Sequence, residues 1–415
     1  MAISRLIAGL DIGSSKVACF IARISGEGAL QITGIGNHKS AGIRSGAVTD
    51  MEKTRASIAA ALDSAEKMAG VKLNDVVIGL SGGQLHSHVL RRDMNIGGNP
   101  VREADKTRLL NECMAAAHIP GHTLLHALPM GYAIDGARDV ADPVNMHGHR
   151  LSLEMHVTSV RTPGFLNLAE CVGNCHIDIR AAMANGYAAG LAVLLEEERQ
   201  LGATVLDMGG GCVSIGVFQG GSLVSASSIP VGGRHVTMDV ARGLSVSFEV
   251  AERLKTRHGS ALASTADDRQ MLDAAQIGED GEGPSRIPKH CLLAITAPRI
   301  EETLELIRAR LKEADTGLAG RRIVLTGGAC QLPGLRERAA EILGRPVRIG
   351  HPGQTPATRD ISGIGEFASA PACSAAAGLL LLAAETGARG VLHRASRPAS
   401  GSRWGGLAAW LRETF

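Results

Sequence analysis

Aromatic residues are scarce in this sequence of 415 residues: it has 6 Phe, 2 Tyr and 2 Trp, although 45% of its residues are hydrophobic. A core must therefore be built from aliphatic side chains and alanine, which are plentiful enough to form one. The length predicts roughly two to four domains, and the composition excludes a collagen-like or disordered chain. The few aromatic residues are unevenly placed, because Trp404, Trp410 and Phe415 all lie in the last twelve residues.

Other features are also missing. Lys and Arg total 43 and Asp and Glu total 41, so the net charge is +2 and no basic field favours nucleic acid as a partner. The 8 cysteines form no Cys-x-x-Cys pair and residues 1–10 contain no secretory signal, which indicates reduced thiols in a cytoplasm. The longest apolar run, 375–384, is too short to span a membrane, so we expect any membrane contact to be peripheral.

One local pattern, a strand, a turn beginning Asp-x-Gly and a second strand, occurs twice. In the first copy the turn 11–16 lies between the expected strands 5–10 and 17–24. The second copy has its turn at 207–211, where Asp207 follows Asp11 by 196 residues. A repeat at about half the chain length predicts two related α/β domains.

The first domain is interrupted. We expect its core to cover 1–83 and 164–200, with an inserted subdomain of short strands at 84–163, where histidine and turn-forming residues become frequent. The spacing of apolar residues predicts a helix over 52–69, and a further helix is expected over 188–199.

The second domain is expected to have the same organisation. Its core would cover 201–233 and 310–385, with an insertion at 234–309. The composition then changes to Gly, Ser, Pro and Arg over 386–402, which predicts a linker. A final amphipathic helix is expected at 403–415.

The two turns have the composition of a phosphate site, because small residues let backbone N–H groups approach an anion and Lys16 adds a positive charge. Taken alone, a Gly-rich turn is more often only a turn. Two facing copies would place Asp11 and Asp207 across one cleft, which is costly unless a divalent cation lies between them and a polyphosphate. A third turn, at Gly327 and Gly328, has room for a flat ring and ribose. The sequence has no P-loop and no complete GxGxxG motif.

These motifs resemble those of the actin/Hsp70/sugar-kinase superfamily, and within it the FtsA family of bacterial cell-division proteins. The resemblance implies an actin-like α/β fold with two duplicated RNase H-like domains, inserted subdomains and a C-terminal amphipathic helix. It rests on the segments 9–16, 207–211, 257–259, 323–329, 377–380 and 410–412.

The resemblance also implies ATP and Mg²⁺ as cofactors, with Mg²⁺ held through water by Asp11 and Asp207. No catalytic residue is predicted. Cys212 and Ser214 stand where the superfamily usually has Thr and often Asp, which predicts slow or absent hydrolysis. The implied nucleotide-binding residues are Asp11, Gly13, Ser14, Ser15, Lys16, Asp207, Gly209, Gly210, Gly211, Glu252, Lys255, Gly327 and Gly328.

The expected C-terminal helix is about 20 Å long at 1.5 Å per residue, too short to cross a bilayer. Its Trp residues and the neighbouring arginines favour the headgroup region of anionic inner-membrane lipid. A single copy would bind weakly, so stable attachment requires several copies on one polymer. The alternative is a lid that docks back on the protein. The residues expected to meet the membrane are Trp404, Leu407, Trp410, Leu411 and Phe415.

For function, the resemblance implies a protein that polymerises on the cytoplasmic face of the inner membrane at the division septum. It would anchor the FtsZ ring there and help to recruit later division proteins. The FtsZ C-terminal peptide would bind the second insertion, where Arg299 matches a basic contact; Arg299 could equally belong to a solvated helix N-terminus. Two alternatives are a small-molecule kinase or phosphatase of the superfamily and a pilus-assembly actin homologue, neither of which accounts for the terminal helix.

Overall fold

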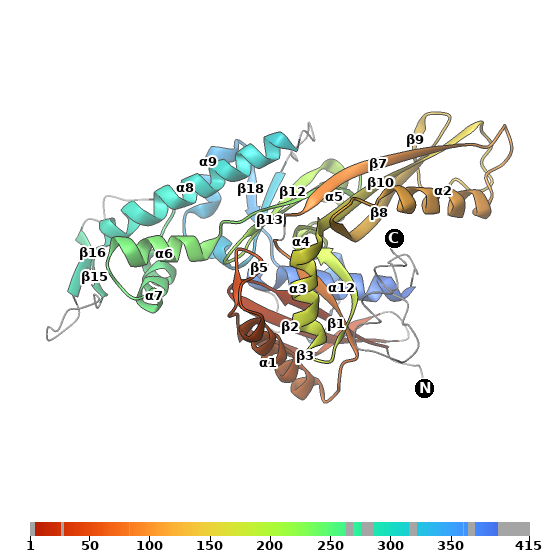
Figure 1. Cartoon of the computed structure of the whole chain (residues 1–415). Helices are drawn as coiled ribbons and strands as arrows, with labels where there is room; N and C mark the ends of the chain where they lie inside the picture. The colour runs from red at the N-terminus through yellow and green to blue at the C-terminus, as the bar shows by residue number, and fades with distance from the viewer. Residues whose placement is uncertain are drawn as a thin grey trace.

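Two five-stranded sheets with their helices form the body of the molecule, and a four-stranded sheet with one helix extends from it at the upper right of Figure 1. The structure is a computed structural model. It describes residues 5–25, 29–82, 84–262, 269–274, 285–314, 322–359, 361–363 and 370–388.

The first sheet has the strand order β11-β6-β1-β2-β3. Its central strand, β1 (Arg5–Ile12), pairs antiparallel with β2 (Lys16–Ile24) and parallel with β6 (Asp75–Leu80). β3 (Leu30–Lys39) and β11 (Asp178–Ala184) form the edges. β1 and β2 are buried along almost their whole length, as expected for strands covered by helices on both faces.

One face of this sheet is covered by α1 (Met51–Ala69), whose apolar side chains join those of the sheet in one core. The helix begins where the Asp50 carboxylate accepts a hydrogen bond from the Lys53 backbone N–H at 3.0 Å. It ends at Gly70, which takes the left-handed conformation with φ 64°.

The opposite face is covered by α4 (Asn185–Val193) and α12 (Ser374–Ala388). Leu379 of α12 packs in the same core as Phe20 of the sheet. This corrects the expectation that 310–385 belongs wholly to the second domain, because the closing helix returns to the first sheet. It also continues to Ala388, three residues into the expected linker.

The second sheet has the order β14-β13-β12-β17-β18. The central strand β12 (Ala203–Met208) pairs antiparallel with β13 (Val213–Gln219) and parallel with β17 (Arg322–Thr326). β14 (Ser222–Ile229) and β18 (Val347–Ile349) form the edges.

Strand order and direction are therefore the same in the two sheets. Asp11 lies opposite Ala18 in the first hairpin and Asp207 lies opposite Ser214 in the second, so the hairpins also share one register. The predicted duplicated α/β fold is confirmed.

Helices and a small hairpin cover the outer side of the second sheet and extend to the upper left of Figure 1. α8 and α9 pack on the sheet, and α6, α7 and the hairpin form a small core of their own with the start of α8. These elements are α6 (Gly233–Gly243), α7 (Phe248–His258), β15 (Met271–Ala274), β16 (Ser285–Pro288), α8 (Lys289–Glu313) and α9 (Leu335–Leu343).

The insertion in the first domain is an antiparallel sheet of order β7-β10-β8-β9 with a helix on one face. Its three main strands are long, whereas short strands were expected. The elements are β7 (His86–Asn95), α2 (Glu103–Ala116), β8 (His122–Ile134), β9 (Ala137–Val140) and β10 (Arg150–Arg161).

The helix predicted over 188–199 is wrong in one respect, because the chain forms two helices there. Leu194 and Leu195 are extended, with ψ 135° and 155°, between α4 and α5 (Glu196–Leu201). The Glu198 carboxylate accepts a hydrogen bond from the Leu195 N–H at 3.0 Å and so starts the second helix. The other elements are α3 (Thr162–Gly173) and the short β4 (Ile43–Arg44), β5 (Ala47–Val48), α10 (Pro356–Arg359), η2 (Gly328–Gln331) and η3 (Pro371–Cys373).

Candidate functional site

Two buried carboxylates lie near the ends of the central strands: Asp11 of β1 is 7% exposed and Asp207 of β12 is 9% exposed. Burial and the charge of Asp11 raise the pKa of Asp207 to about 7, and the Lys16 ammonium opposes this rise. Burial also raises the pKa of Asp11, again against the effect of Lys16. The structure thus brings the two predicted acids together, with Lys16 beside them.

The two Gly-rich turns contact each other. A side chain at Gly210 would overlap the Ser15 hydroxyl, and one at Gly211 would overlap the Ser14 hydroxyl, so only glycine fits at these positions. Ser14 is fixed in turn, because its Oγ accepts a hydrogen bond from the Gly46 N–H at 3.1 Å. A polyphosphate between the turns would require them to move apart.

Lys16 closes the first turn, because its carbonyl oxygen accepts a hydrogen bond from the Gly13 N–H at 3.0 Å. Its Nζ lies 3.6 Å from Sγ of Cys373 in the 3-10 turn Pro371–Cys373, just before α12. Burial raises the pKa of the Cys373 thiol, so the thiol is neutral at pH 7. The closing helix is thus connected to the first turn.

The third turn, which follows β17, contacts the second acid. Gly327 has φ 84°, and a side chain there would overlap Oδ1 of Asp207. Its N–H donates a hydrogen bond to the Pro371 carbonyl at 3.0 Å. A Cβ at Gly328 would meet only Ala372, at 3.7 Å, which leaves room for a flat group at this turn.

Glu252 and Lys255, both on α7, are connected to the second turn through Gly233. Lys255 Nζ donates hydrogen bonds to Glu252 Oε2 at 2.7 Å and to the Gly233 carbonyl at 3.2 Å. The Gly233 N–H in turn donates to the Gly209 carbonyl at 3.0 Å. The implied cofactor residues of the second half are thereby brought into one region.

One buried polar residue beside the acids was missed by the sequence analysis. Asn185, the first residue of α4, donates a hydrogen bond to Asp11 Oδ1 at 2.8 Å and another to Ser81 Oγ at 2.6 Å. No motif marks it. A prediction of which strand lies next to β6 would have placed residue 185 near Asp11.

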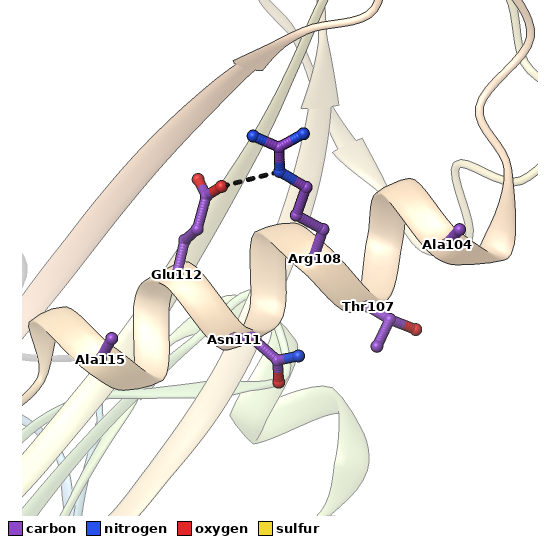
Figure 2. Close-up of a pocket in the computed structure, with 6 residues that line it drawn as sticks. All are labelled: Ala104, Thr107, Arg108, Asn111, Glu112 and Ala115. Atoms are coloured by element: carbon purple, nitrogen blue, oxygen red, sulfur yellow. Dashed lines mark hydrogen bonds and ion pairs between the residues drawn. The ribbon is translucent and has the colours of Figure 1, made fainter. Parts of the chain in front are cut away.

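A shallow hollow of about 580 Å³ lies elsewhere, along the exposed side of α2 in the insertion (Figure 2). Arg108 and Glu112 form an ion pair at 3.0 Å on this surface. The hollow shares no residue with the region of the two acids. Its lining residues are Ala104, Thr107, Arg108, Asn111, Glu112 and Ala115.

Arg299 lies within α8, ten residues after its start, so the alternative of a solvated helix N-terminus is wrong. Its side chain is 28% exposed and forms ion pairs with Asp239 of α6 and with Glu302, the latter at 2.5 Å. The guanidinium therefore already has two acidic partners.

The residues expected to meet the membrane, Trp404, Leu407, Trp410, Leu411 and Phe415, lie outside the described residues. Among the helices that the structure does describe, none has the length and apolar content that crossing a membrane requires.

Duplicated sheets of this order, with an acid near the end of each central strand and Gly-rich turns between them, define an actin-like protein. Solved structures agree on the fold. The chain is similar to the PilM-PilN type IV pilus biogenesis complex, with TM-score 0.64 and 16% identity over 91% of this chain and 98% of that one. It is also similar to MreB 5 of Spiroplasma citri bound to AMPPNP, with TM-score 0.51 and 13% identity over 93% and 98% of the chains.

The family follows from closer relatives. The sequence model of the family described as cell division protein FtsA matches residues 204–378. The family model of the SHS2 domain inserted in FtsA matches residues 82–159. The chain is 39% identical to the cell division protein FtsA of Rhizobium meliloti, over 99% of this chain and 95% of the relative. It is 31% identical to that of Escherichia coli, over 99% and 98%. The chain belongs to the FtsA family of cell-division proteins.

Proposed function

We propose that the chain is an ATP-binding cell-division protein that polymerises on the cytoplasmic face of the inner membrane at the division septum. There it anchors the FtsZ ring and helps to recruit later division proteins. The main support for a nucleotide site is the pair of buried acids, Asp11 and Asp207, beside the Gly-rich turns. The charge of Asp11 raises the pKa of Asp207, and such repulsion between two acids favours a divalent cation between them. Family membership supports the role in division.

The residues around the two acids have the chemistry that ATP with Mg²⁺ requires, once the two turns move apart to admit the phosphates. Backbone N–H groups of the two turns would hold the phosphates, with Lys16 as a counter-charge. The turn at Gly327 and Gly328 would hold the adenosine, and Glu252 and Lys255 complete the site. Asp11 and Asp207 would hold Mg²⁺ through water, and the cation would neutralise part of the phosphate charge.

Slow turnover remains part of the proposal. Burial raises the pKa of the Cys212 thiol to about 12, so it stays protonated and cannot act as a base at pH 7. Ser214 is buried, and its hydroxyl is not basic enough to activate water. We expect an ATP turnover well below the ordinary enzyme rate of about 1 s⁻¹. A faster rate of phosphate release would contradict this.

Membrane attachment is proposed for the amphipathic segment 403–415, in many copies along a polymer. The test is co-sedimentation with liposomes of anionic lipid, comparing the full chain with one that ends at Gly401, with and without ATP and FtsZ. We expect only the full chain to bind, and more strongly with ATP. Equal binding by the two chains would overturn the membrane role.

The FtsZ peptide is proposed to bind at Arg299, where its acidic groups would replace Asp239 and Glu302 as partners. Arg299→Glu should weaken peptide binding at least about tenfold, and Asp239→Asn, which removes a competitor, should strengthen it. Fluorescence anisotropy with the labelled peptide measures both. The control is Arg310→Glu, near the other end of α8. Unchanged affinity in Arg299→Glu would remove this residue from the site.

A further inference from the structure

Three parallel strands place Asn185 near Asp11. On β1, Asp11 lies opposite Gly79 of β6, and β6 lies next to β11, whose last residue is Ala184. Asn185 follows directly and begins α4. Asp11 and Asn185 therefore lie at the same end of the sheet, separated by the width of one strand.

The amide reaches across β6 because Gly79 has no side chain. A Cβ on Gly79 would overlap Oδ1 of Asn185. Asn185 itself is 1% exposed. Its amide nitrogen donates to Asp11 Oδ1 at 2.8 Å and to Ser81 Oγ at 2.6 Å. Its oxygen has no hydrogen-bond partner among the described residues.

The Asn185 amide uses its donors but not its acceptor. Both N–H donors are used, whereas a buried acceptor is left unpaired, which ordinarily costs free energy. A donor aimed at a buried carboxylate is also stronger than a neutral hydrogen bond. The hydrogen bond to Asp11 therefore favours this position of the Asn185 amide despite its unpaired oxygen.

The second half lacks the equivalent arrangement. The position equivalent to Gly79 is Thr326, which lies opposite Asp207. Its hydroxyl is engaged elsewhere, 2.6 Å from the Ser374 hydroxyl and 3.0 Å from the Gly350 carbonyl oxygen. Among the described residues, no side-chain amide donates to Asp207. The duplicated site is thus asymmetric, with only one acid held by an amide.

We propose that Asn185 is a positioning residue that holds the Asp11 carboxylate in one orientation for the divalent cation of a bound nucleotide. This inference rests on the proposed nucleotide site. Without the amide, the carboxylate could rotate, and each productive binding event would have to orient it again. The effect should therefore appear in the cation dependence of binding rather than in every property of the protein.

The experiment measures ATP binding to the full chain by isothermal titration calorimetry at several Mg²⁺ concentrations and in EDTA. For Asn185→Ala we expect the Mg²⁺ concentration at half-maximal binding to rise about tenfold, the size expected for losing one hydrogen bond to a charged group. The affinity for ATP in EDTA should change less than about twofold, because no cation is then present for the Asp11 carboxylate to hold. Gly79→Ala, which displaces the amide without changing it, should act in the same direction.

The matched control is Ser81→Ala, which removes the other partner of the same amide and leaves the contact with Asp11. It should keep the Mg²⁺ dependence of the natural chain. If Asn185→Ala is too unstable to measure, Asn185→Leu keeps the side-chain volume and removes the donors. Thermal midpoints without ATP are recorded for all variants.

The outcomes separate the two hypotheses. If the natural chain binds no ATP with Mg²⁺, the proposed nucleotide site is wrong. If it binds, and Asn185→Ala shows the same Mg²⁺ dependence, only the role of Asn185 is wrong. A loss that is equally large in EDTA, or that Ser81→Ala reproduces, would also overturn that role, since it would indicate a general packing effect.

Discussion

The Asp207 carboxyl makes folding sensitive to pH. Its pKa is raised to about 7 by burial and by Asp11, whereas an unfolded Asp has a pKa of about 3.9. Between these values the unfolded chain releases a proton that the folded chain keeps. Stability without nucleotide therefore falls as pH rises from about 4 to about 7 and then levels off.

We predict that Asp207→Asn removes this loss. The amide is neutral at every pH, so the variant should exceed the natural chain in thermal midpoint by an amount that grows from pH 4.5 to pH 7.5 and stays constant above. At neutral pH the free energy of unfolding should be higher in the variant by an amount on the order of a few kcal/mol. Circular dichroism melts of the two chains give the difference. Asp63→Asn, at an exposed carboxyl on α1, serves as the control. A pH-independent difference would contradict the prediction.

Site residues could be predicted from the sequence where they lie within a short motif. Asp11, Asp207 and the glycines of both turns lie within short repeated motifs, and their spacing identified them. Asn185 has no such motif, because its relation to Asp11 is created by strand order and by the missing side chain of Gly79. The contact between Lys16 and Cys373 spans most of the chain and is equally invisible locally.

At the scale of elements, the crossing of α4 and α12 is unusually close. A side chain at Gly378 of α12 would overlap the carbonyl oxygen of Ala188 in α4. We predict that Gly378→Ala lowers the free energy of unfolding by about 1–3 kcal/mol or more, because neither backbone can move without disturbing both cores. The control is Gly164→Ala in α3, where the new methyl meets nothing within 4 Å and should stabilise the helix slightly. Urea unfolding measures both. Equal effects would contradict the crossing as the cause.

Elements were predicted well where their ends carry a chemical signal. α1 (Met51–Ala69) is capped by Asp50 before its first residue and by Gly70 after its last, so its predicted bounds were nearly correct. The break between α4 and α5 has neither Gly nor Pro and depends on Glu198, whose carboxylate also binds Arg348 of a distant strand. The placement of α12 on the first sheet is likewise a tertiary effect, because its sequence shows only that it is apolar.

At the scale of the whole molecule, the insertion joins the two halves. It leaves the first domain after β6, but its strands β7, β8 and β10 contact β14, the edge strand of the second sheet. The Ser87 hydroxyl accepts a hydrogen bond from the Ala226 N–H at 2.9 Å and lies 2.7 Å from Nε2 of His156. The repeat predicted two facing domains, but it contained no information on where the insertion would rest.

We expect nucleotide binding to loosen the contact between the insertion and β14. The Ser15 and Gly210 turns are in contact, so a polyphosphate between them must separate the halves that Ser87 and Ala226 bridge. We predict that ATP with Mg²⁺ speeds hydrogen exchange of the Ala226 amide about tenfold or more, because exchange follows local opening. The amide of Val205, in the central strand β12, should stay protected as the internal control. Ser87→Ala should speed exchange at Ala226 even without ATP. If Ala226 keeps its protection when ATP is bound, the insertion moves with the second half and the halves do not part at this joint.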